Sequence, residues 1–206
     1  MALVKYNNNS LSAVTSTGLT AGAMTLIKSQ TASSSSTIDF VNGTSDVVFD
    51  GTYPIYVFKF INIHPGTDAS YLTFQADTGT NTSYNQTMTT TYFQAKQKED
   101  DSGSGLEYAT GDDQAQATAF QRITGLVGSD NDQCASGEIF IYSPSSSTYV
   151  KHFMSKFSFC DRNDRMFNSF AAGYFNTTTA LTRLQFKFHQ GNIDAGTIKL
   201  YGIKDS

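Results

Sequence analysis

Short runs of alternating apolar and polar residues recur along the chain from Gly22 onward, separated by clusters of Ser, Asn, Gly and Asp. The clearest run covers residues 182–189, where Leu184, Phe186 and Phe188 alternate with polar or charged side chains. Successive side chains of a strand point to opposite faces of its sheet. This run therefore predicts a half-buried antiparallel strand whose apolar side faces a core.

The same alternation predicts further strands, bounded by turn-forming residues, over most of the chain. We expect them at residues 24–29, 37–41, 47–49, 53–64, 71–76, 84–95, 138–142, 149–159 and 197–203. The two runs that flank residues 143–147, which include Pro144, predict a hairpin.

Two segments break this pattern. Residues 96–111 are charged and rich in glycine, so we expect a loop there. Residues 112–120 begin with two aspartates and contain three alanines, which favours one short helix.

The run at residues 53–64 is apolar on both of its sides, which is typical of a central strand covered on both faces. We expect a neighbouring subunit to cover part of it. The candidate partner-binding side chains on this run are Tyr56, Phe58 and Phe60.

The first twenty residues are small and polar and follow neither a helical nor a strand period. Such a segment becomes ordered only against a partner or its own domain, because it buries too little apolar surface by itself. We therefore expect an extended arm at residues 1–20, with Tyr6 and Leu11 as candidate partner contacts, and a single β-sandwich domain at residues 21–206.

About ten strands, at most one short helix and frequent turns predict an all-β fold. An antiparallel β-sandwich of jelly-roll type is the best match among the sandwiches.

The composition narrows the classes of partner. Charged residues make up 16% of the chain and the net charge is -4, with a pI near 5.2. A nucleic-acid binder needs clustered Lys and Arg, so we expect no nucleic-acid partner. No apolar run approaches the roughly 20 residues that cross a bilayer, so we expect no membrane partner.

The chain starts without the basic and apolar pattern of a secretory signal, so we expect synthesis in a cytoplasm. In that reducing compartment Cys134 and Cys160 are expected to remain free thiols rather than to form a disulfide.

No pattern of catalytic or metal-binding residues stands out. His64, His152 and His189 lack the spacing of a zinc site, and residues 130–132 resemble a solvated turn more than a calcium loop. No Gly-x-Ser-x-Gly motif is present. We therefore expect a protein that is not an enzyme and that has no catalytic residues, bound metal or cofactor.

Four tyrosines near strand ends, Tyr142, Tyr149, Tyr174 and Tyr201, allow two interpretations. Aromatic rings can stack on a host surface glycan, or they can fill a subunit interface, where they are enriched. We favour the interface.

The closing segment GNIDAGTIKLYG, residues 191–202, resembles the final hairpin of many phage virion proteins. From MALVKYNNNS at the start through FINIHP and KHFMSKF, the chain is similar to structural proteins of marine tailed phages. This resemblance implies a virion protein with a jelly-roll fold, commonly assembled as a trimer, and it implies no catalytic residues.

Within that resemblance, a decoration or cement protein that binds the major capsid protein on the outside of the head is the leading expectation. Multivalent contacts would then stabilise the shell. A tail appendage, such as a fibre tip, adaptor or receptor-binding protein in contact with other tail proteins or host glycan, is the alternative. A carbohydrate-binding module or a hydrolase outside any virion is a third, less favoured expectation.

Overall fold

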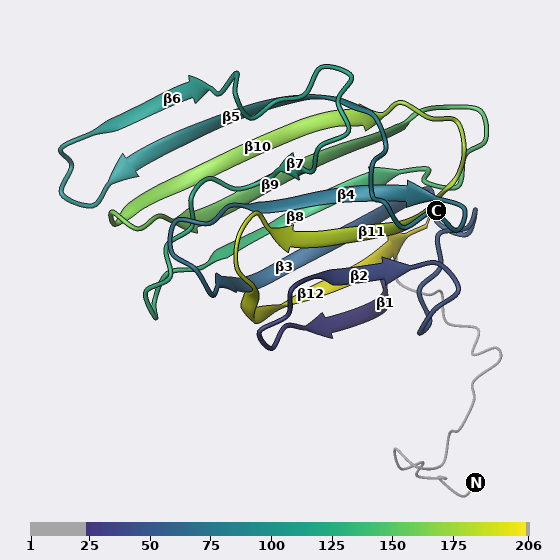
Figure 1. Cartoon of the computed structure of the whole chain (residues 1–206), viewed down its shortest axis with the longest axis horizontal. Helices are drawn as coiled ribbons and strands as arrows, with labels where there is room; N and C mark the ends of the chain where they lie inside the picture. The colour runs from purple at the N-terminus through teal and green to yellow at the C-terminus, as the bar shows by residue number, and fades with distance from the viewer. Residues whose placement is uncertain (1–23, 205–206) are drawn as a thin grey trace, which may run out of the picture.

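Two antiparallel sheets packed face to face make up the part of the chain that the computed structural model describes, residues 24–204 (Figure 1). This architecture confirms the predicted all-β, jelly-roll-like sandwich. The predicted arm, residues 1–20, lies outside the described residues.

The larger sheet has eight strands, with β1 at one edge and β6 at the other (Figure 1). Its strands in spatial order are β1 (Met24–Thr31), β12 (Ile193–Ile203), β3 (Ile55–Pro65), β8 (Ala135–Tyr142), β9 (Lys151–Cys160), β10 (Arg165–Phe175), β5 (Met88–Lys98) and β6 (Ser104–Tyr108).

The smaller sheet has four strands and covers one face of the larger sheet. Its spatial order is β2 (Ile38–Val41), β11 (Leu181–Phe188), β4 (Leu72–Thr78) and β7 (Gln121–Arg122).

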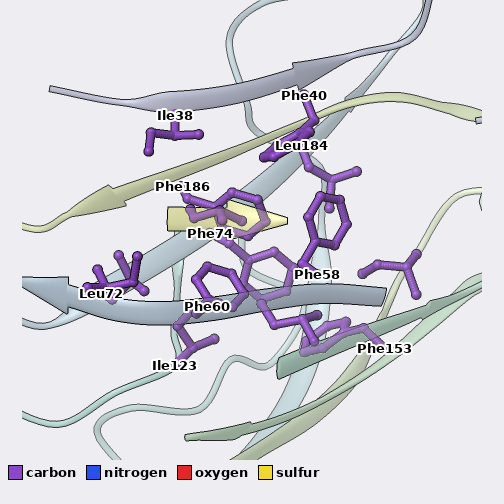
Figure 2. Packing of buried hydrophobic residues seen from close by; sticks show 14 of the residues in the cluster. Ile38, Phe40, Phe58, Phe60, Leu72, Phe74, Ile123, Phe153, Leu184 and Phe186 are labelled. Carbon is purple, nitrogen blue, oxygen red and sulfur yellow. The ribbon is translucent and has the colours of Figure 1, made fainter. Parts of the chain in front are cut away.

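Aromatic side chains fill the space between the two sheets (Figure 2). Phe186 of β11 lies with its ring centroid 5.1 Å from those of both Phe58 and Phe60 of β3. Phe74 of β4 meets Phe153 of β9 edge-on at 4.9 Å. These contacts identify the face of each strand that points into the core, and alternation then places the intervening residues on the outside.

Tyr56, Phe58 and Phe60 therefore belong to the core, which corrects the prediction that they bind a partner. At most 2% of each is exposed. Both sides of this strand are apolar, so its sequence pattern could not tell which side would face the second sheet.

Most predicted strands are present, and the hairpin formed by β8 and β9 is confirmed. Residues 47–49 are the exception, because Val47 and Phe49 are buried in a loop without strand pairing. Phe49 is held there by its backbone N–H, which donates to Asn42 Oδ1 at 2.8 Å, and by edge-on packing of its ring on Tyr56.

The predicted loop at residues 96–111 is wrong over much of its length. β5 continues to Lys98, the chain turns, and β6 pairs with residues 93–97 of β5. All five residues of β6 are exposed. Because neither side of this strand is buried, its sequence carries no alternation of apolar and polar residues imposed by burial.

The short helix predicted at residues 112–120 is also wrong. Its backbone pairs with the first part of β5 instead: Met88 and Ala117 exchange two hydrogen bonds, at 2.8 and 3.1 Å, and Thr90 N–H donates to Gln114 O. Strand β10 was not predicted, and it pairs along its whole length with both β9 and β5. Within residues 24–204, no helix is long and apolar enough to cross a membrane.

Candidate functional site: the outer face of the larger sheet

The outward sides of the two sheets differ in how the chain covers them. On the smaller sheet, Gln75 of β4 points outward and is fully buried, because its side-chain amide donates to the carbonyl oxygens of Gln86, Thr118 and Ala119 at 3.0–3.1 Å. Two connecting segments thus cross that side. The corresponding side of the larger sheet, which we call the outer face, carries most of the exposed apolar surface.

Ten large hydrophobic side chains are exposed within residues 24–204, and eight of them lie on the outer face. The two others are Leu126 and Tyr149. The eight are Met24, Leu26, Ile61, Phe93, Leu106, Tyr108, Met154 and Met166. Apolar side chains gathered on one face, rather than scattered singly, mark a surface that binds another molecule.

An unbroken row of paired residues crosses seven strands of this face, and we call it the apolar row. It starts at Leu26, which is 51% exposed, and passes through Met154, which is 55% exposed. In order, the row is Leu26, Tyr201, Val57, Phe140, Met154, Ala172 and Thr91. Val57 points outward and is nevertheless fully buried between Tyr201 and Phe140.

A second row lies at the end of the sheet, and we call it the terminal row. Met24, Ile203, Ile55 and Tyr142 are paired in sequence across β1, β12, β3 and β8. On β9, β10 and β5 the same end of the face carries His152, Tyr174 and Thr89.

A hollow of about 540 Å³ opens between the two rows, over β9, β10 and β5. Tyr142, His152, Met154 and Tyr174 line it, and the small side chain of Ala172 leaves the space open. The ring of His152 lies 5.7 Å from that of Tyr174, and Tyr142 Oη donates to the Met154 sulfur at 3.7 Å. A mostly apolar hollow with few polar groups suits an apolar side chain of a partner.

A third row of the outer face carries charged side chains. Lys199, Lys59, Glu138 and Lys156 lie side by side on β12, β3, β8 and β9, and Lys59 forms an ion pair with Glu138. The two apolar rows on one side of these charges therefore form a continuous surface from the edge strand β1 to β10.

Three of the four predicted tyrosines share this face. Tyr142 and Tyr174 line the hollow, and Tyr201 belongs to the apolar row. Tyr149 lies apart from them, 73% exposed in the turn before β9. Tyr6 and Leu11 fall outside the described residues.

The sequence analysis did not single out the aliphatic members of the face, Met24, Leu26 and Met154. For Met154 a signal was present, because it is an apolar residue at an outward position of a strand whose inward side carries Phe153, Phe157 and Phe159. Only β3 was interpreted in that way.

The two thiols lie at the opposite end of the outer face. Cys134, directly before β8, lies opposite Cys160, the last residue of β9. Cys160 N–H donates to Cys134 O at 3.4 Å, and both cysteines are free. They line a hollow of about 370 Å³ together with Glu99 and Asp132.

Burial raises the pKa of both thiols, and the nearby carboxylates of Asp164 and Asp161 raise that of Cys160 further. A raised pKa keeps a thiol protonated and opposes its use as a nucleophile. In the described part of the chain, no three His, Cys, Asp or Glu side chains meet in a way that could hold a metal ion.

The fold and this face define the class of the protein: an all-β sandwich that leaves an apolar sheet face uncovered. No protein-family model, curated protein or solved structure matches the chain.

Proposed function

We propose that this protein is a non-enzymatic structural subunit on the exterior of a phage particle, which assembles with copies of itself and with neighbouring virion proteins through the outer face. The observation that carries the proposal is the gathering of eight of ten exposed large hydrophobic side chains on that one face. Covering them would remove apolar surface from water, the main favourable contribution to protein association.

A decoration protein of the capsid is the form of this proposal that we favour. The outer face is one side of an eight-stranded sheet and not an enclosed site. Such a broad surface suits contact with several subunits at once. The virion as its location is proposed from the resemblance of the closing segment, residues 191–202, to the final hairpin of phage virion proteins.

A tail appendage that contacts host glycan is the second candidate, and a specific observation favours it. Tyr142 and Tyr174 line one hollow beside His152, so aromatic rings are available for stacking on a sugar. Binding of the purified protein to a glycan array, lost in Tyr174→Ala, would favour this candidate.

Self-association can be tested with charged substitutions at exposed positions. We expect the full chain to form an oligomer, with a trimer as the specific expectation, in light scattering at micromolar concentration. A Leu26→Asp, Met154→Asp double variant should be monomeric with an unchanged circular dichroism spectrum. Tyr149→Asp is the matched control, since Tyr149 is exposed but lies off the outer face. A monomeric wild-type chain would contradict self-assembly.

The location can be tested by counting copies in purified particles with quantitative mass spectrometry and by immunogold labelling. Hundreds of copies on the head are expected for a decoration protein. A dozen or fewer on the tail would favour the appendage, and none in the particle would refute the proposal.

A further inference from the structure

The described chain begins on the terminal row. Met24, the first residue of β1, is 43% exposed and is paired with Ile203 at the end of the sheet. The residues that precede it thus join the domain at the same end of the outer face as the hollow. β1 runs inward from this end, so a straight continuation backwards from Met24 leads past the sheet.

The preceding segment, residues 1–23, is long compared with the distance along the sheet from β1 to the hollow. An extended chain spans up to about 3.3 Å per residue, or about 75 Å for this segment. β10 lies five strand spacings from β1, and at about 4.8 Å per spacing the hollow is about 24 Å along the row. Measured from Met24, the extended chain reaches up to about 59 Å at Tyr6 and about 43 Å at Leu11, roughly twice this distance, which leaves length to cross between two copies.

The composition of the segment fits the surface. It carries no acidic residue and a single lysine, Lys5, so nothing in it opposes burial on two apolar rows. From Tyr6 onward its larger apolar side chains are separated mainly by Asn, Ser and Thr. The larger apolar side chains of the whole segment are Met1, Leu3, Val4, Tyr6, Leu11, Val14 and Leu19.

We propose that residues 1–23 of one copy lie across the terminal row of a neighbouring copy and place Tyr6 or Leu11 in the hollow lined by Tyr142, His152, Met154 and Tyr174. This inference rests on the proposed self-assembly and names the segment that completes the interface. The direction of β1 favours exchange of arms, because a segment that returned over its own sheet would first have to reverse before Met24.

Disulfide trapping between two differently tagged copies tests the exchange. In a Cys134→Ser, Cys160→Ser background, one copy carries Tyr6→Cys or Leu11→Cys and the other carries Ala172→Cys, at the floor of the hollow. On mild oxidation by oxidised glutathione, two thiols lose their protons and two electrons to form one disulfide, and glutathione is reduced. We expect a cross-linked heterodimer on a non-reducing gel with at least one of the two arm positions.

Ser158→Cys is the matched control, because Ser158 is exposed on the same face but away from the terminal row. Its cross-linking should be at least tenfold weaker than that of Ala172→Cys. Equal yields at the two positions, or no heterodimer with either arm position, would overturn the inference. A bond found only within single chains that carry both substitutions would overturn it as well, since the arm would then fold onto its own copy.

A companion measurement separates this inference from the proposed function. In the full chain, Tyr6→Asp with Leu11→Asp should weaken self-association at least tenfold in sedimentation equilibrium. Unchanged association of this variant, with loss of association in Leu26→Asp, Met154→Asp, would refute the arm exchange and leave assembly through the outer face in place.

Discussion

Phe186 of β11 packs edge-on against Phe58 of β3, with ring centroids 5.1 Å apart and ring planes at 61°. These residues belong to different sheets and are far apart in sequence, and Phe186 also meets the rings of Phe40 and Phe60. This cluster joins the two sheets, so its loss should affect the whole fold.

We predict that Phe186→Ala lowers the free energy of unfolding by about 3–5 kcal/mol, because it removes a fully buried ring and leaves a cavity. Urea denaturation followed by circular dichroism measures the loss. Phe93→Ala is the control, since Phe93 is partly exposed on the outer face, and it should cost about 1 kcal/mol or less. Equal losses in the two variants would contradict the assigned core.

Lys151 provides a pH-dependent prediction. Its side chain is buried, its ammonium donates to the carbonyl oxygens of Tyr149 and Thr177 at 3.0 and 3.2 Å, and burial lowers its pKa below the ordinary value of 10.5. The unfolded chain keeps the ordinary pKa. Between the two values the unfolded state therefore binds more protons, so the contribution of Lys151 to stability increases with pH.

Relative to Lys151→Met, the wild-type chain should thus gain stability as the pH rises from the lowered pKa of Lys151 toward 10.5, by at most about 1.4 kcal/mol per pH unit. Chemical denaturation of both proteins across this range gives the difference directly. Lys204→Met, at an exposed position, should run parallel to the wild type. If the free energy of unfolding of Lys151→Met also ran parallel to that of the wild type across this pH range, the pKa of Lys151 would not be lowered.

The two cysteines should react slowly despite being partly exposed. The thiolate is the nucleophile, and burial raises the pKa of both Cys134 and Cys160. We expect alkylation by iodoacetamide at about pH 7.5 to be slower than that of a free cysteine, and to become as fast in urea. Mass spectrometry resolves the two sites, using Cys134→Ser and Cys160→Ser as references. Rates equal to that of free cysteine in the folded protein would refute the raised pKa values.

Strict alternation was enough to predict several strands correctly. β11 and β9 carry apolar side chains at alternate positions over much of their length, and both lie where the pattern placed them. The long apolar run of β3 also lies where it was predicted. Phe153, Phe157 and Phe159 share the buried side of β9, as their spacing predicted. The period of a strand is a local property, so the sequence of one segment is sufficient to reveal it.

β6 and residues 112–120 were predicted wrongly because their conformations depend on a distant strand. Both lie along the edge of β5, which supplies hydrogen-bond partners to glycine-rich and alanine-rich segments that show no strand pattern of their own. β10 has apolar side chains on both sides and a central Ala-Ala-Gly, and it lies between β9 and β5.

The sequence by itself determined that this chain forms a two-layered all-β protein, because alternating side chains can be buried only when sheets stack. The tertiary structure alone decided which side of each strand is the inside. In β3 both sides are apolar, and the position of the smaller sheet placed Phe58 in the core and left the row through Val57 facing outward. The candidate interface follows from that choice, since side chains from seven strands form one surface only after the strands have paired.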